Sequence, residues 1–238
     1  MKNVPKRARA GGTRAGTAPE RAPSRAAEDY LKAVYKLQAG GDSVSTSALA
    51  EELGRSAASV TNMVKALADQ GLLEHVPYRG VLLTSEGEQA ALRIIRRHRV
   101  IEAYLIEKLE YTWDGVHAEA ERLEHAASEI LIDRMDRALG RPAIDPHGAP
   151  IPTRDGEIAR REFDSLADLP VGTPAVVREV SDEDSQRLRY LASLGLFPGT
   201  VVVLREKRPF GGPLTLSVEG TERVVDRRLA TMIRVERV

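Results

Sequence analysis

Apolar residues recur at helical spacing along the first part of the chain. From Arg25 they follow an i, i+4, i+7 pattern that predicts a helix, and two shorter helices follow over residues 45–53 and 57–70, separated by Gly54. Two short helices around a tight glycine-containing turn are typical of a helix-turn-helix motif. Generic packing of three helices produces the same periodicity, so this pattern is not specific by itself.

A short β-like segment follows these helices. Residues 72–76 and 81–84 alternate in a strand-like way around the tetrapeptide Pro77-Tyr78-Arg79-Gly80, which predicts a hairpin with a basic, aromatic tip. A hairpin in this place is the wing of a winged-helix domain, and small or hydroxyl-bearing side chains on the preceding helix suit close approach to a major groove. The residues that we expect to contact DNA are Ser56, Ala57, Ala58, Ser59, Thr61, Asn62, Lys65 and Arg79.

Two predicted helices in the middle of the chain carry histidine and carboxylate side chains. In the long helix of residues 85–109, His98 and Glu102 lie among apolar residues, where a carboxylate needs a partner. A second helix, from Trp113 to His125, begins near the N-cap candidates Thr112 and Asp114. At about 100° per residue, its polar members share one strip roughly 100° wide; these are His117, Glu121, Glu124 and His125.

Imidazole and carboxylate groups are the ligands expected for Mn²⁺, Fe²⁺, Co²⁺ or Zn²⁺. Alternatively, the strip is an ordinary solvated polar face of the helix. His98 could likewise be a histidine of the core without a metal. Asp29 lies off the apolar stripe of the first helix and is free to face another element. A further helix from Ser128 to Leu139 suggests helix-on-helix packing, between subunits if the protein dimerises on a palindrome.

The C-terminal third changes to a β-like pattern. Short apolar runs separated by Gly and Pro predict a small barrel, interrupted by one helix at residues 185–194. An acidic cluster, Asp182-Glu183-Asp184 with Gln186, precedes that helix. It is either a set of metal ligands or a helix-capping cluster.

Composition narrows the class of protein. The chain has 238 residues, no cysteine and no net charge, and it contains no long apolar run that would span a membrane. No secretory signal is visible, so a cytoplasmic protein is expected. Residues 1–25 hold seven basic residues and one acidic residue. This segment is expected to be a disordered tail, either a phosphate-binding arm or functionally inert.

Several motifs in order resemble the diphtheria-toxin-repressor (DtxR) family of metal-dependent transcriptional repressors. They are Glu28-Asp29-Tyr30-Leu31, Tyr78-Arg79-Gly80 with Leu83-Thr84, Arg97-His98-Arg99, Val116-His117-x-Glu119-Ala120 with Glu124-His125, and residues 145–152. The similarity runs from about Arg25 to the C-terminus, and Leu194-Gly195-Leu196-x-Pro198-Gly199 resembles the SH3-like domain of ferrous-transport accessory proteins.

The resemblance implies a mainly α protein with a small β domain. Its expected parts are a basic tail (1–24), a winged-helix DNA-binding domain (25–90), a helical metal-binding and dimerisation domain (91–150), a linker (151–162) and an SH3-like β-barrel (163–238). The primary metal site maps to Asp29, Glu121, Glu124 and His125, and the ancillary site to His98, Glu102 and His117, with Asp184 and Gln186 as further candidates. His75 and His147 match no ligand position and are expected to be structural or surface residues.

Two positions in this resemblance bear on the metal. Iron-responsive members carry Met where this chain has Asp29 and Cys where it has Glu121, so two hard oxygen ligands replace two sulfur ligands. This favours Mn(II), with Fe(II) as the alternative. Short manganese-responsive members have Glu where this chain has Lys32, so two separated sites are expected instead of a binuclear cluster.

The expected function is therefore that of a repressor, not an enzyme. It would bind a palindromic operator in double-stranded DNA as a homodimer, in response to Mn(II), and control genes of metal uptake or homeostasis. Two other classes of protein are alternatives: a winged-helix repressor that senses an organic ligand, and a dinuclear metallohydrolase. The chain shows neither a nucleophile motif nor a glycine-rich phosphate loop that a hydrolase would need.

Overall fold

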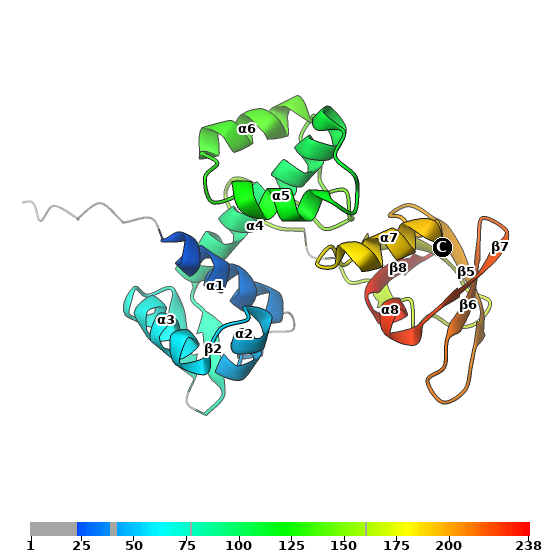
Figure 1. The fold of residues 1–238 in the computed structure, drawn as a ribbon, viewed down its shortest axis with the longest axis horizontal. Coiled ribbons are helices and arrows are strands. Elements are labelled where there is room, and N and C mark those ends of the chain that lie inside the picture. The colour runs from blue at the N-terminus through cyan, green and yellow to red at the C-terminus, as the bar shows by residue number, and fades with distance from the viewer. Residues whose placement is uncertain (1–22, 39–41, 77, 160) are drawn as a thin grey trace, which may run out of the picture.

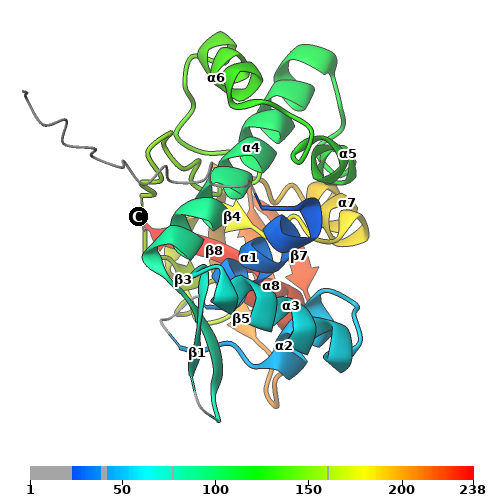
Figure 2. The same ribbon diagram turned by 90° about the vertical axis from the view of Figure 1, so that its left-hand side faces the viewer.

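Three folded parts follow one another along the chain (Figures 1 and 2). The structure, a computed structural model, describes residues 23–38, 42–76, 78–159 and 161–238. The predicted basic tail lies almost entirely outside the described residues, as do Gly40, Gly41 and Pro77. Within the part of the chain that is described, no helix is both long enough and apolar enough to cross a bilayer.

The first part is a winged helix, as the sequence predicts. Its elements are α1 (Arg25–Leu37), α2 (Thr46–Glu52), α3 (Ala57–Asp69), β1 (Leu73–Val76) and β2 (Gly80–Leu83). Ser24, Ser45 and Ser56 each accept a hydrogen bond from a backbone N–H in the first turn of the helix that follows, which explains where the three helices begin. The two strands are antiparallel, and Val81 also pairs with Val44 ahead of α2.

Gly80 is required where the wing returns to the domain. Its φ is +125°, and a Cβ at this position would lie 2.0 Å from the carbonyl oxygen of Val44. No other residue fits this approach without moving the backbone. The wing is therefore fixed to the segment that enters the helix-turn-helix.

The second part is helical and is joined to the first by one long helix. Its elements are α4 (Ser85–Leu109), α5 (Val116–Leu123) and α6 (Glu129–Ala138). The N-terminal turns of α4 pack against α1, and its C-terminal half packs against α5 and α6 (Figure 2). Buried residues from all three helices form this core; they are Val100, Ile101, Leu105, Val116, Ala120, Ile132 and Ile151.

The long helix α4 begins at Ser85 as predicted, with Thr84 as its N-cap, whose hydroxyl accepts from Gly87 N. Two details of α5 differ from the sequence prediction. The N-cap of α5 is Gly115 and has no side-chain hydrogen bond, so neither Thr112 nor Asp114 caps this helix. The helix also ends at Leu123, and His125 lies in the following turn rather than on a continuous helical strip.

The third part is an antiparallel SH3-like sheet with strand order β3-β8-β4-β5-β6-β7. The strands are β3 (Asp164–Ser165), β4 (Pro174–Val180), β5 (Val201–Lys207), β6 (Leu214–Val218), β7 (Thr221–Val225) and β8 (Ile233–Arg237), with helices α7 (Ser185–Ser193) and α8 (Arg227–Thr231). Register shifts in the β4–β8 and β5–β6 pairs are bulges that help the sheet to curve. The short elements β3 and α8 were not predicted from the sequence.

The third part is held against the second by specific contacts. Trp113 packs on the SH3-like core, with its ring 4.9 Å from that of Phe197, and its indole N–H donates to Pro146 O over 3.0 Å. The N–H of Val180, at the end of β4, donates to His147 O over 3.0 Å. These contacts place the loop after β4 beside α4 and α5.

Candidate metal centre and nucleic-acid interface

Among the described residues, three groups of potential metal ligands lie where α1, α4 and α5 meet. The first, which we call the α4 cluster, consists of His98 and Glu102 from α4, His117 from α5 and Asp182 from the loop after β4. The second, the α1 cluster, consists of Asp29 from α1 with Glu124 and His125 from the turn after α5. In each group the potential ligand atoms lie within 4.8 Å of one another.

The α4 cluster is centred on Glu102, which is completely buried. Its Oε1 lies 3.0 Å from His98 Nε2 and 3.2 Å from His117 Nδ1. Asp182 Oδ2 approaches the same groups, 3.5 Å from His117 Nδ1 and 3.9 Å from His98 Nε2. Two helices of the second part and one loop of the SH3-like domain therefore contribute to this cluster.

The α1 cluster joins the winged helix to the turn after α5. His125 Nε2 lies 2.9 Å from Asp29 Oδ1 and 3.4 Å from Glu124 Oε1. The other ring nitrogen, Nδ1, is 2.7 Å from Glu28 Oε2. Asp29 thus faces the second part of the molecule, as its position off the apolar stripe predicts.

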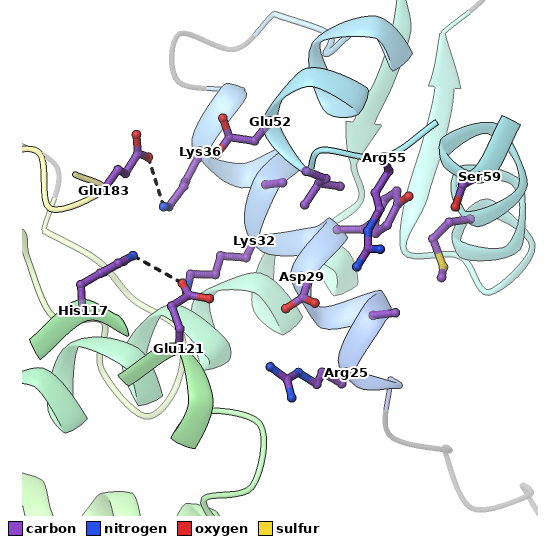
Figure 3. Close-up of a pocket in the computed structure, with 15 residues that line it drawn as sticks. Arg25, Asp29, Lys32, Lys36, Glu52, Arg55, Ser59, His117, Glu121 and Glu183 are labelled. Carbon is purple, nitrogen blue, oxygen red and sulfur yellow. Dashed lines mark hydrogen bonds and ion pairs between the residues drawn. The ribbon is translucent and has the colours of Figure 1, made fainter. Parts of the chain in front are cut away.

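Lys32 lies between the two clusters. Its Nζ is 2.7 Å from Glu121 Oε1 (Figure 3). It is also 2.9 Å from Glu124 Oε2 and 3.3 Å from His98 Nδ1. These three partners form a third group of ligand atoms within 4.8 Å, and the ammonium lies among them. The structure therefore groups Glu121 with Lys32 rather than with Asp29.

Charges in the α4 cluster are balanced by protons. Burial lowers the pKa of His117, but hydrogen bonds to Asp182 and Glu102 outweigh it and raise the pKa to about 10. Burial would raise the pKa of Glu102, yet the nearby imidazoles of His117, His147 and His98 hold it well below its usual range. Burial would also raise the pKa of Asp182, but its hydrogen bond with His117 and the charges of His117 and Lys36 together lower it.

Lys32 balances the remaining carboxylates. Burial lowers its pKa, but the charges of Glu124 and Glu121 have the larger combined effect, so the pKa is raised. The ammonium therefore stays charged at neutral pH. One permanent cation and the protonated imidazoles hold a group of carboxylates that would otherwise repel each other.

Several buried polar atoms point into the clusters without a hydrogen bond among the described residues. In the α1 cluster this atom is His125 Nε2. Next to the α4 cluster they are Glu102 Oε2 and His147 Nδ1, which are 3.7 Å apart. Unpaired lone pairs of imidazole and carboxylate that converge in this way fit a divalent cation, and the donor set is that of Mn²⁺, Fe²⁺ or Zn²⁺.

The acidic loop before α7 is arranged differently from the sequence expectation. Asp182 reaches the α4 cluster, whereas Asp184 is the N-cap of α7 and accepts from the backbone N–H groups of Gln186 and Arg187. Asp184 and Gln186 are therefore not placed as ligands, and the capping interpretation of Asp184 is correct.

The two histidines without an expected ligand role lie in different environments. His147 is buried, donates from Nε2 to Trp113 O over 3.0 Å and adjoins Glu102. His75 is exposed on β1.

A cleft of about 680 Å³ leads to the clusters from the winged-helix side (Figure 3). Asp29, Lys32, His117 and Glu121 line its inner wall, and residues of α2 and α3, including Ser59, line the opposite side. The cleft connects the interior carboxylates to solvent, and residues of both the winged helix and α5 line it.

Every residue predicted to contact DNA is exposed. Two hydroxyls on α3 already have partners: Ser56 caps the helix, and Thr61 donates to Ala57 O over 2.8 Å. Asn62, Lys65 and Arg79 project from the surface of α3 and the wing. Tyr78, beside Arg79 at the wing tip, is fully exposed and has a φ of +63°.

Three comparisons with known proteins agree with this architecture. Residues 24–81 match the N-terminal DNA-binding domain of iron-dependent repressors, residues 84–153 match their metal-binding and dimerisation domain, and residues 165–237 match the FeoA domain. The iron-dependent repressor IdeR of Mycobacterium leprae is 31% identical over 89% of this chain and 96% of its own length. The chain belongs to the diphtheria-toxin-repressor family.

Solved structures support the same family. A manganese-dependent transcriptional repressor in complex with manganese matches with a TM-score of 0.84 and 39% identity, over 89% of this chain and all of its own. The manganese regulator SloR matches with a TM-score of 0.75 and 33% identity, over 89% of this chain and 98% of its own. The chain is thus a metal-dependent transcriptional repressor, and its family is one of transcriptional repressors rather than of enzymes.

One feature of the site was missed in the sequence, and another was left open. Glu28 stands in a motif that pointed to the family, but the sequence gave no sign that its carboxylate contacts His125, 97 residues later. Asp182 was one of several adjacent acids. The helix start at Ser185 could have separated them, because the residue before it is the natural cap.

Proposed function

We propose that this repressor responds to Mn(II), binds a palindromic operator as a homodimer and controls genes of metal uptake or homeostasis. The observation that carries the proposal is the donor set: each ligand atom in the two clusters is a carboxylate oxygen or an imidazole nitrogen. Mn²⁺ gains least from sulfur and tolerates oxygen-rich coordination. The match to a manganese-dependent repressor over nearly the whole chain supports this choice.

In this proposal each cluster holds one metal ion. Asp29, Glu124 and His125 form the primary site, with Glu121 as a further ligand once it leaves Lys32. His98, Glu102, His117 and Asp182 form the ancillary site. Because Lys32 occupies the space between them with a permanent charge, the two ions bind apart and are not bridged there.

The geometry suggests how metal would control DNA binding. A bound divalent cation would supply the charge that lets Asp29, Glu124 and His125 stay close together. Asp29 belongs to the winged helix, whereas Glu124 and His125 follow α5 in the helical domain. Holding them together fixes α1 against α5, and so the position of α3 relative to the dimerisation helices. Metal would raise the DNA affinity only to the extent that it binds more tightly to the arrangement of domains that binds DNA than to the other arrangements.

The second candidate is an Fe(II)-responsive repressor. IdeR and the diphtheria toxin repressor of Corynebacterium efficiens, which is 30% identical over 89% of this chain and 95% of its own length, favour it. High-spin Fe²⁺ also accepts imidazole and carboxylate ligands. In that case the relative availability of Fe²⁺ and Mn²⁺ in the cell would decide which ion the repressor binds.

The test is a fluorescence-anisotropy titration of labelled duplexes from upstream of metal-transporter genes. Mn²⁺, anaerobic Fe²⁺, Zn²⁺ or a chelator is added to the wild type and to the variants Glu124→Ala and His125→Ala. Glu119→Ala is the matched control, because Glu119 lies on α5 shortly before these residues but pairs with Arg122. Mn²⁺-dependent binding that only the two ligand variants lose supports the proposal. Equal response to Fe²⁺ favours the second candidate, and tight binding in chelator overturns metal control.

A further inference from the structure

Glu28 lies directly behind the α1 cluster and its carboxylate is divided between two partners. The residue is 9% exposed. Oε2 is 2.7 Å from His125 Nδ1, and Oε1 accepts a hydrogen bond from Arg97 over 3.2 Å. Glu28 adjoins Asp29 in sequence, but on a helix consecutive side chains diverge by about 100°. The two carboxylates therefore approach the imidazole of His125 at opposite nitrogens.

This contact determines which nitrogen of His125 is free. Carboxylates face both ring nitrogens and can only accept a proton, but only Nδ1 makes a hydrogen bond, so a neutral imidazole carries its proton on Nδ1. Nε2 then has a lone pair, faces Asp29 Oδ1 at 2.9 Å and, although buried, makes no hydrogen bond. The Nε2 lone pair and the Asp29 carboxylate are both acceptors, and two acceptors that face each other are arranged to bind a cation between them. Proteins orient metal-binding histidines in this way, through a hydrogen bond made by the ring nitrogen that does not bind the metal.

Arg97 fixes Glu28 in this role. Its guanidinium donates to Glu28 on α1 and also contacts Glu129 Oε1, at 2.7 Å from Nε and 2.6 Å from Nη2. Glu129 is the first residue of α6. The planar guanidinium therefore connects the carboxylate behind His125 to the beginning of the third helix of the dimerisation domain.

We propose that Glu28 is a positioning residue for metal binding: it holds His125 in the Nδ1-protonated tautomer and aims Nε2 into the α1 cluster. The inference rests on the proposed metal site and adds a residue outside the ligand set. Glu28 is not a ligand itself, because His125 and Arg97 take up its two oxygens on the side of the ring away from Nε2.

The test compares Glu28→Met with Glu28→Gln. Methionine removes the acceptor at similar volume, whereas glutamine keeps a carbonyl oxygen for Nδ1–H. Free Mn²⁺ is measured by electron paramagnetic resonance during titration, in a His117→Ala background so that the retained ion belongs to the α1 cluster. We expect Glu28→Met to weaken Mn²⁺ binding about 10- to 100-fold and Glu28→Gln to restore most of the affinity. Glu129→Gln is the matched control, since it alters the same network without touching His125.

Two further measurements make the outcome specific. Imidazole ¹⁵N spectra of the metal-free protein should show His125 protonated at Nδ1 in the wild type and in Glu28→Gln, but not in Glu28→Met. Unchanged Mn²⁺ affinity in Glu28→Met, or a Glu28→Gln variant as weak as Glu28→Met, overturns the proposal. If His125→Ala also binds Mn²⁺ normally, it is the proposed primary site that fails.

Discussion

The ammonium of Lys32 lies 2.9 Å from Oε2 of Glu124, a carboxylate with no exposed surface. A buried charge pair of this kind contributes little net stability compared with apolar groups, but removal of one member is costly. Lys32 thus holds the carboxylates together, and in the proposed arrangement it stands between the two metal sites. We therefore expect both the stability of the metal-free protein and the number of metal ions bound to depend on this one side chain.

Replacing Lys32 with Met should destabilise the metal-free protein by about 3–5 kcal/mol, because Glu124 and Glu121 lose their buried cation. Urea denaturation in chelator measures the change, and saturating Mn²⁺ should reverse much of it. Lys36→Met is the control, since Lys36 pairs with Glu183 on the surface at 3.3 Å. That change should cost less than about 1 kcal/mol. Equal stability of the two variants in chelator would contradict the role given to Lys32.

Asp182 and Asp184 should separate metal binding from helix capping. Asp182→Ala removes a carboxylate 3.5 Å from His117 Nδ1 and should weaken Mn²⁺ binding at the α4 cluster about 10-fold or more. Asp184→Ala should leave the Mn²⁺ affinity unchanged and cost about 1 kcal/mol of stability, because it removes the N-cap of α7. Calorimetric titration with Mn²⁺ and thermal unfolding measure the two effects. The assignment is wrong if Asp184→Ala is the variant that loses metal.

The helices could be located from the sequence because their signals are local. Apolar spacing defines α1, α3 and α4, and serine caps set the starts of α1, α2, α3 and α6. The elements that were missed, β3 and α8, have two and five residues and are too short for periodicity to register. The prediction that α5 continues to His125 failed because the alternation of polar residues does not reveal that the chain turns after Leu123.

The sequence predicted which types of residue form the site, but it did not predict how these residues are arranged. Helical spacing and family motifs found the histidines and carboxylates. The contacts of Lys32 with Glu121 and Glu124 join residues 89 and 92 positions apart, and no local rule relates them. The choice of Asp182 over its neighbours likewise depends on how the SH3-like domain packs near Trp113. Tertiary packing decides these distances.

Arg79→Ala should weaken operator binding without changing Mn²⁺ affinity. Arg79 is exposed at the wing tip and belongs to neither cluster. Loss of one phosphate contact should lower affinity by about 10-fold and reduce the slope of log K against log salt by about 1. Arg93→Ala, an exposed arginine on α4, is the control. An unchanged affinity and salt slope in Arg79→Ala would remove the wing from the DNA interface.

The metal-free protein should lose stability as the pH rises from about 7 to 10. In the folded state the pKa of His117 is raised from 6.5 to about 10, with Asp182 and Glu102 as its hydrogen-bonding partners. The folded state therefore binds this proton more tightly than the unfolded state, so its contribution is complete below pH 6.5 and is lost as the pH rises through about 10. Thermal unfolding in chelator measures the trend, and His117→Gln should show a smaller decline because it carries no such proton. Saturating Mn²⁺ should also reduce the decline, because an imidazole bound through the same nitrogen has already given up its proton. Parallel pH profiles for the wild type and His117→Gln would show that the charge of His117 does not hold the α4 cluster together.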